Sequence, residues 1–379
     1  MTKILFVFGG IPQMGGTEAV MSTIYRTIDV TRFHIDFLFF GDPKNDTSAF
    51  THDVSQHSQV FYVPRLRDSI QANHQGIETI LKEHRYDIIH THMDASGTDV
   101  LRIAQKCGVK VRIAHSHNTG HLENIHGLKA HLHRVYIDWQ KSRITKYATH
   151  YIGCSRAAGE WLFGKSICKQ DNFMVFRNAI DVEKYAFNPE IRENLRNKLQ
   201  LNGKKVIGHV GRFDYQKNHP YLIDIFSKVY AKDHSAELFL IGNGADMPKI
   251  QEQVKNLGLE EHVHFLGNQS NVNEWLQCFD VFVMPSHYEG LGIVLIEAQA
   301  AGLPCFASDI IPSEASVSNL IEFIDLALNS EVWANKILKY FENPLPRVSP
   351  VQQIYKKGYD SKFNIKELEN FYEKSFGNY

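Results

Sequence analysis

The 379-residue sequence has few cysteines and no long apolar run. Its five cysteines are odd in number and form no Cys-x-x-Cys pair, which argues against a disulfide framework or a zinc ribbon and suits a reducing compartment. No run approaches the ~18 apolar residues that a membrane span requires, and the apolar stretch 4–8 is too short for a signal peptide. We therefore expect a cytoplasmic protein, with a peripheral position at the inner face of the cell membrane left open.

The sequence also lacks an excess of either charge. The 41 Lys and Arg residues balance 42 Asp and Glu residues, so a dedicated nucleic-acid binder is disfavoured. The two halves nevertheless differ, because residues 1–180 hold 21 basic and 16 acidic residues, whereas residues 181–379 hold 20 and 26. Of the 20 histidines, 14 precede residue 181. We expect the two halves to act in different surroundings.

The glycine-rich segment 9–16 lacks the pattern of the common nucleotide-binding loops. It is not Gly-x-Gly-x-x-Gly, and no acidic residue follows the second apolar run in the manner that binds ribose, so a nicotinamide dehydrogenase is disfavoured. The chain has no Gly-x4-Gly-Lys-Ser/Thr loop either. Gly15 and Gly16 still precede a helix that we expect to begin near Glu18, and they could admit a phosphate group.

What the sequence does contain is a repeated alternation of short apolar runs with helical patterns. Continuous apolar runs are typical of parallel strands buried on both faces, so the pattern predicts sheets wrapped by helices. The expected strands form two series, at 3–8, 33–40, 87–90 and 111–115, and then at 205–210, 237–241, 262–266 and 280–284. After Ala307 we expect helices alone. The last of them is amphipathic, with Phe363, Leu368, Phe371, Tyr372 and Phe376.

Each series of strands resembles one Rossmann-like domain, and the length of the chain also favours two domains. A plausible linker lies near residue 180. Because ligands bind beyond the carboxyl ends of the strands in open α/β sheets, we expect the two domains to face each other across a cleft that holds the site.

The most informative motif is the segment 285–298, Pro-Ser-His-Tyr-Glu-Gly-Leu-Gly-Ile-Val-Leu-Ile-Glu-Ala. A strand ends before it, and a helix is expected to begin near Ile293. Glycines at a helix N-terminus let backbone N–H groups approach an anion. Glu289 in the loop and Glu297 on the helix could accept hydrogen bonds from different hydroxyls of one elongated ligand. The alternative is a solvated charge at Glu289 and a helix-dipole partner at Glu297.

A second motif, at 211–220, also follows a strand and precedes a helix. Arg212 and Lys217 place two cations in one loop, where they suit a phosphate. Asn218 is a candidate N-cap. The alternative is a solvated basic loop.

Two histidine pairs end consecutive strands of the first series: His90 with His92, and His115 with His117. Facing one another they could bind zinc, but no cysteine lies nearby, and polar groups lining a cleft are the favoured interpretation.

The segment 126–147 combines apolar residues at helical spacing (Leu128, Leu132, Val135 and Trp139) with basic ones (Lys129, Arg134, Lys141, Arg143 and Lys146). It fits either an anionic membrane surface or a helix packed on its domain with a solvated basic face.

Together, these motifs resemble the retaining glycosyltransferases of family 4, which have the GT-B fold. The resemblance rests on the order and spacing of the segments 211–218, 241–244, 263–267 and 285–298, and Glu289 with Glu297 matches the family's Glu-x7-Glu motif. The segment 297–305 is similar to the EpsF-like enzymes of exopolysaccharide and capsule synthesis. One departure is Ala179, where the family usually has glycine. The chain also lacks the Asp-x-Asp motif of metal-dependent transferases.

The resemblance implies roles for individual residues. Arg212 and Lys217 would hold the donor diphosphate, Glu289 the transferred sugar, and Glu297 the ribose. His117 would lie near the sugar, with His115 as the competing choice. Further donor contacts would come from Gly16, Gly211, Gly242, Asn243, Asn268, Gly290, Leu291 and Gly292. No cofactor and no metal ion are expected.

The resemblance therefore implies transfer of a hexosyl or N-acetylhexosaminyl group from a nucleotide sugar, by family habit a UDP-sugar, to a saccharide or lipid-linked acceptor. The implied domains are 1–180 for the acceptor and 181–358 for the donor, with a helix at 359–379 that returns to the first. Alternatives are a nucleotide-sugar epimerase of the same fold and a non-catalytic partner subunit of a glycosyltransferase complex.

Overall fold

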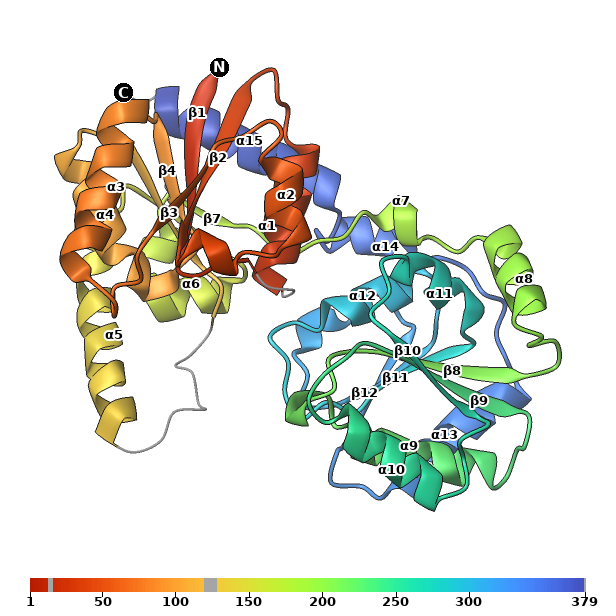
Figure 1. Cartoon of the computed structure of the whole chain (residues 1–379). Helices are drawn as coiled ribbons and strands as arrows, with labels where there is room; N and C mark the ends of the chain where they lie inside the picture. Colours follow the sequence, from red (N-terminus) through yellow and green to blue (C-terminus); the bar gives the residue numbers. More distant parts are fainter. Residues whose placement is uncertain (13–15, 119–127, 378–379) are drawn as a thin grey trace. The chain divides into compact units, whose positions relative to one another are not determined.

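A computed structural model of the chain describes residues 1–12, 16–118 and 128–377. The chain forms two compact units, and Figure 1 shows a sheet with flanking helices in each. The first unit comprises Met1–Asn178 and Ser361–Tyr379, and the second comprises Ala179–Asp360.

The first unit is built on a seven-stranded sheet in the order β3-β2-β1-β4-β5-β6-β7, with every neighbouring pair parallel. Its central strands are almost entirely buried because helices cover both faces, which is why they read as continuous apolar runs in the sequence. The strands are β1 (Thr2–Phe8), β2 (Phe33–Phe40), β3 (Val60–Val63), β4 (Ile88–Thr91), β5 (Val111–Ser116), β6 (His150–Gly153) and β7 (Phe173–Val175).

Two hydrophobic clusters lie on the two faces of this sheet. One face packs against α3 (Ile70–His84), α4 (Thr98–Lys106), α5 (Leu128–Tyr147) and α6 (Arg156–Phe163). The other packs against α1 (Gly16–Thr27), α2 (Ala49–Val54) and α15 (Ser361–Gly377).

The C-terminal helix α15 returns to the first unit, as expected (Figure 1). Leu368 and Tyr372 are completely buried in the cluster, and Glu369 forms an ion pair with Arg32 at 3.1 Å. The expected apolar face is only partly right, because Phe363 and Phe376 are exposed. Ile365 and Ser375, which are buried near the same two ends of α15, show that the helix is covered there on another side than that of Phe363 and Phe376.

The second unit repeats the same strand order as β10-β9-β8-β11-β12-β13, again with parallel neighbours. Its strands are β8 (Lys205–Val210), β9 (Ala236–Ile241), β10 (Val263–Gly267), β11 (Val281–Met284), β12 (Cys305–Ser308) and β13 (Ile321–Ile324). Its helices are α7 (Val182–Tyr185), α8 (Pro189–Lys198), α9 (His219–Tyr230), α10 (Met247–Asn256), α11 (Val272–Cys278), α12 (Ile293–Ala300), α13 (Ser330–Glu342) and α14 (Val351–Lys356). Both sheets therefore have the Rossmann order.

The expectation that only helices follow Ala307 is wrong, because β13 adds an edge strand to the second sheet. Of its four residues, two are partly buried, Glu322 is exposed and Ile324 is buried, which gives a weaker signal than a buried central strand. Within the described part of the chain, no helix combines the length and apolarity needed to span a membrane.

Candidate active site

The expected diphosphate-binding residues follow two neighbouring strands of the second sheet. β8 and β11 pair in parallel at the centre of the sheet, so the loops after Val210 and Met284 leave the same edge. The order of the strands changes direction between these two, which is where ligands bind in open α/β sheets.

The two loops are joined by an ion pair between residues 72 positions apart. Nζ of Lys217 lies 2.7 Å from Oε1 of Glu289, and only 15% and 7% of the two side chains are exposed. Gln216 donates from Nε2 to the second carboxylate oxygen at 3.3 Å and to the carbonyl of Tyr288 at 3.1 Å. Glu289 is therefore not a solvated loop charge. Its carboxylate holds the ammonium group of Lys217 in a fixed, largely buried position.

Asn218 also links the two loops. Its side chain bonds to the second loop and does not cap α9, so the expected N-cap is wrong. It stands directly before α9, but its side chain makes no capping hydrogen bond. With φ at 53° the backbone is left-handed, and Nδ2 donates to the carbonyl of Pro285 at 3.1 Å. Asparagine tolerates this conformation better than most residues.

Arg212 differs from Lys217 in exposure. Its side chain is 63% exposed, and Nη1 lies 4.0 Å from Oδ2 of Asp214. Oδ1 of Asp214 accepts a hydrogen bond from the backbone N–H of Lys217 at 3.4 Å. The site thus combines one buried, oriented cation with one exposed cation that can move toward a ligand. Asp214 links the two, and sequence reasoning missed it.

The expected glycines allow the loops after β8 and β9 to touch. A Cβ on Gly242 would lie 2.0 Å from the carbonyl oxygen of Gly211, and the φ of Gly242 is 135°. A Cβ on Gly211 would crowd the side chain of Lys217 at 3.0 Å. Both glycines therefore have a packing role that places Lys217.

The remaining expected donor contacts of this unit are more exposed. Asn243 is exposed, and its carbonyl accepts a hydrogen bond from the backbone N–H of Phe213 at 3.1 Å. Asn268 is exposed directly after β10. Oδ1 of Asn243 accepts a hydrogen bond from the backbone N–H of Gly244 at 2.8 Å, but neither side chain is as buried as that of Lys217.

Helix α12 begins at Ile293, as expected, after the loop Gly290-Leu291-Gly292. Gly292 is left-handed at φ 77°, and a Cβ on Gly290 would meet no atom within 4 Å. Glu297 lies on α12, where burial raises the pKa of its carboxyl to about 7, partly offset by a hydrogen bond from the hydroxyl of Tyr185. Tyr185 on α7 is a site residue that sequence reasoning missed.

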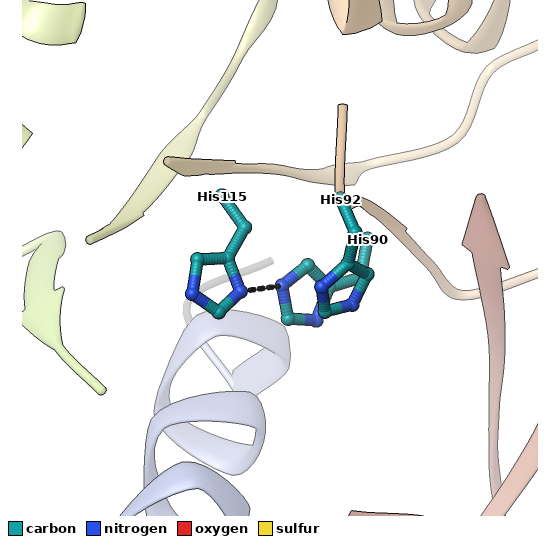
Figure 2. A group of neighbouring side chains, drawn as sticks. All are labelled: His90, His92 and His115. Carbon is teal, nitrogen blue, oxygen red and sulfur yellow. Dashed lines mark hydrogen bonds between the residues drawn. The ribbon is translucent and has the colours of Figure 1, made fainter. Parts of the chain in front are cut away.

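In the first unit, the rings of the four histidines lie against one another. His90 is hydrogen-bonded to His115 and His92 to His117, whereas the closest stacked rings are those of His90 with His92 and of His115 with His117. Figure 2 draws His90, His92 and His115. Nε2 of His90 lies 3.1 Å from Nδ1 of His115, and Nδ1 of His92 lies 3.1 Å from Nε2 of His117. The ring of His90 stacks on that of His92 at 4.2 Å, and the ring of His115 stacks on that of His117 at 4.1 Å. Adjacent parallel strands with residues two apart produce this arrangement.

The histidine cluster is uncharged. Burial lowers the pKa of all four imidazoles, in His90, His92 and His115 to well below the ordinary value. The charge of Asp94 opposes that shift only at His117. Ligand nitrogens of His90, His92 and His115 lie within 4.8 Å of one another. Three imidazoles at this spacing could hold a metal ion, but a ligand set that used Nε2 of His90 and Nδ1 of His115 would replace the hydrogen bond between them.

His115 and His117 differ in accessibility. His115 is completely buried, whereas His117 is only partly buried at the end of β5. Oδ1 of Asp94 accepts the backbone N–H of His117 at 2.7 Å and holds this end of the strand. Asp94 has a left-handed backbone with φ 48°, and sequence reasoning missed it. Gly16 is the first residue of α1, and Gly15 lies outside the described residues.

Two residues of the apolar stripe expected on helix α5, Val135 and Trp139, are exposed. Gln140, Ile144 and Tyr147 are buried, whereas Val135 and Trp139 are 54% and 51% exposed. The guanidinium group of Arg143 lies 4.0 Å from the centre of the Trp139 ring. The side chains of residues 128–133, and residues 126 and 127, lie outside what the structure describes.

Comparison with known proteins adds two family matches. Residues 191–359 match the family "Glycosyl transferases group 1", and residues 14–184 match "Glycosyltransferase Family 4". The chain is 31% identical to the putative glycosyltransferase EpsF of Bacillus subtilis, over 98% of this chain and 96% of that protein. It is 25% identical to an Escherichia coli protein named UDP-Gal:alpha-D-GlcNAc-diphosphoundecaprenol alpha-1,3-galactosyltransferase, over 91% and 94% of the two chains.

Solved structures show the same fold. Anabaena HepE in complex with UDP has a TM-score of 0.78 at 18% identity and covers 99% of this chain and all of its own. The complex of HepE with UDP-glucose has a TM-score of 0.69 at 19% identity, covering 100% of this chain and 99% of its own. These comparisons, with the two sheets and their loops, show that the chain belongs to glycosyltransferase family 4, the retaining glycosyltransferases of the GT-B fold.

Proposed function

We propose that the protein moves a hexosyl or N-acetylhexosaminyl group, without a metal ion, from a UDP-sugar to a saccharide or lipid-linked acceptor. The product would be a bacterial exopolysaccharide, capsule or other cell-surface glycan. The observation that carries the proposal is the buried pair of Lys217 and Glu289 at the same sheet edge as Arg212 and the first turn of α12. The names of the EpsF and galactosyltransferase relatives, and the UDP bound by HepE, support it.

The cations and the helix end supply what departure of a nucleoside diphosphate requires. As the bond between the anomeric carbon and the β-phosphate oxygen breaks, negative charge gathers on that oxygen. Lys217, Arg212 and the backbone amides of Gly290–Gly292 would stabilise this charge. Because Lys217 and the backbone amides are positioned beforehand, they lower the barrier without a metal ion, and Arg212 adds an exposed positive charge.

The two carboxylates would bind different parts of the donor. Glu289 would accept hydrogen bonds from hydroxyls of the transferred sugar while it holds Lys217 at the phosphate. Glu297, hydrogen-bonded by Tyr185, would accept the ribose hydroxyls. His117 and Gly16 would add contacts to the sugar and phosphates.

The acceptor would attack from the face that the diphosphate leaves. A new bond forms between the acceptor oxygen and the anomeric carbon, and the acceptor proton passes to the leaving phosphate oxygen. This route preserves the anomeric configuration without a covalent enzyme intermediate.

A screen of nucleotide sugars tests the proposal. A donor at 100 times its dissociation constant stabilises the folded protein by about 2.7 kcal/mol, so UDP-sugars should raise the melting temperature more than GDP- or ADP-sugars. Incubation of the stabilising donor alone should give slow hydrolysis. Epimerised nucleotide sugar would instead support an epimerase, and absence of both binding and turnover would support a non-catalytic subunit.

We further propose that the exposed side of α5 contacts an anionic membrane surface, which would bring the enzyme to a lipid-linked acceptor and give a cytoplasmic protein a peripheral membrane position. Val135 and Trp139 are exposed beside the basic residues Arg134 and Arg143, and a basic surface with an exposed tryptophan suits anionic headgroups.

A further inference from the structure

In the histidine cluster of His90, His92, His115 and His117, one nitrogen of each ring lies within hydrogen-bond distance of a nitrogen of another ring. The tautomer of each neutral ring is defined by which of its two nitrogens carries the proton. In the pair of His92 and His117, Nδ1 of His92 faces Nε2 of His117 at 3.1 Å. Nε2 of His92 is buried and has no hydrogen-bond partner among the described residues. Nδ1 of His117 makes no hydrogen bond to a described residue either, but His117 is only partly buried.

Two tautomer arrangements satisfy the contact between the rings. If His117 donated from Nε2, His92 would have to keep its proton on Nε2, where a buried N–H would have no acceptor among the described residues. If His92 donates from Nδ1, its Nε2 carries a lone pair instead. A buried donor without a partner is rarer and costlier than an unused acceptor.

The surroundings of His92 support the second arrangement. The ring of Phe8 stacks on that of His92 with an interplanar angle of 10° at 4.7 Å, and Phe6 lies 4.9 Å away. Neither phenylalanine side chain offers an oxygen or nitrogen acceptor to an N–H on Nε2 of His92. Burial lowers the pKa of the nearby imidazoles of His90 and His115. Nε2 of His90 lies 3.1 Å from Nδ1 of His115 and Nδ1 of His90 lies 2.8 Å from the hydroxyl of Tyr372, whereas Nε2 of His115, like Nε2 of His92, makes no hydrogen bond to a described residue. Asp94 reaches His117 through the backbone N–H of that residue.

We propose that His92 is a positioning residue that fixes His117 in the tautomer protonated on Nδ1, so that His117 presents an N–H donor to its ligand. The ligand atom must then be an acceptor, such as the oxygen of a sugar hydroxyl, and a cation is rejected. This inference rests on the proposed function only where it takes that ligand to be the transferred sugar.

The tautomer can be read directly by NMR. In full-length protein labelled with ¹⁵N-histidine, long-range ¹H–¹⁵N correlations show which ring nitrogen carries the proton, and the variants His92→Asn and His117→Gln assign the signals. We expect both His92 and His117 to be protonated on Nδ1 at neutral pH. Protonation of His117 on Nε2 would overturn the proposal.

Two substitutions of His92 separate positioning from packing. The side-chain amide introduced by His92→Asn can donate to Nε2 of His117, so this variant should keep the tautomer and lose less than about threefold in kcat/KM for the donor. His92→Leu cannot donate, so His117 should populate both tautomers and kcat/KM should fall about tenfold. Equal losses in the two variants would overturn the positioning role.

Two further variants distinguish a failure of the proposed tautomer from a failure of the proposed sugar contact of His117. His150→Leu removes another buried histidine, on β6, and should leave the tautomer of His117 unchanged. His117→Ala tests the proposed sugar contact alone. If transfer survives that change, the assigned role of His117 in the reaction fails, whereas the tautomer is still decided by the spectrum.

Discussion

Lys217 and Arg212 carry the same charge into the same loop, but their surroundings differ. Lys217 is 15% exposed and paired with Glu289, whereas Arg212 is 63% exposed. Removing Lys217 therefore also leaves a buried carboxylate without its cation, which destabilises a protein by itself. Arg212 is more exposed and lies 4.0 Å from Asp214, whose side chain is 32% exposed, so we expect a smaller loss of stability when Arg212 is removed.

We predict that Arg212→Ala and Lys217→Ala each lower the turnover rate by 10²–10³, which corresponds to about 3–4 kcal/mol of lost transition-state stabilisation. Lys217→Ala should lower the melting temperature more than Arg212→Ala. The control is Lys249→Ala, which removes an exposed lysine from α10. Steady-state kinetics with the best donor measure the effect, and near-normal turnover in both variants would refute the role.

At the scale of elements, α5 shows how a helix can present a face other than the one its sequence suggests. Gln140, Ile144 and Tyr147 are among its buried residues, and Nε2 of Gln140 donates to Asp99 on α4 at 2.9 Å. A buried glutamine is a weak signal of a packing face, and Trp139 is a strong one, so the residues of α5 that pack are not those that the hydrophobic pattern singles out.

The proposed membrane contact of α5 predicts vesicle binding that depends on charge. We expect the protein to co-sediment with vesicles that contain phosphatidylglycerol, less so at high salt, because added ions screen the attraction. Trp139→Ala and Arg134→Ala should each weaken this binding. Arg67→Ala, which removes an exposed arginine of the same unit outside α5, is the matched control. Equal binding to neutral phosphatidylcholine vesicles would contradict the proposal.

At the scale of the whole molecule, buried neutral histidines make stability depend on pH. Burial lowers the pKa of the four clustered histidines, of His150 and His209 to about 4, and of His219 to about 2. In the unfolded chain these groups titrate near pH 6.5, so below that pH the unfolded state binds more protons than the folded state. Each such group contributes stability that is complete above pH 6.5 and is lost as the pH falls toward its folded pKa.

We therefore predict that the free energy of unfolding falls steeply below pH 6.5, by about 1.4 kcal/mol per pH unit for each neutral histidine. Glu297 acts in the opposite direction between its unfolded pKa and about pH 7, but it is a single group. Urea titrations between pH 5 and 8 measure the slope. The variant His150→Leu should reduce it by one histidine's share, and a flat profile would contradict the neutral cluster.

Much of the fold could be predicted because its physical signal is local. The strands at 33–40 and 205–210 have the predicted bounds, since strands covered on both faces are rich in apolar residues along their length. The amphipathic α15 likewise required a surface to cover. The edge strand β13 escaped prediction because it has only four residues and the charged Glu322 interrupts its apolar run.

The sequence by itself determined the two parallel sheets and the residue types available at the ends of their strands: cations, carboxylates, glycines and imidazoles. Only the tertiary structure decided which of them meet. Lys217 and Glu289 are 72 residues apart, and His92 and His117 are 25 apart, so no local pattern can pair them. They meet because parallel strands release their loops at one edge, and because the register between neighbouring strands sets which side chains share a face.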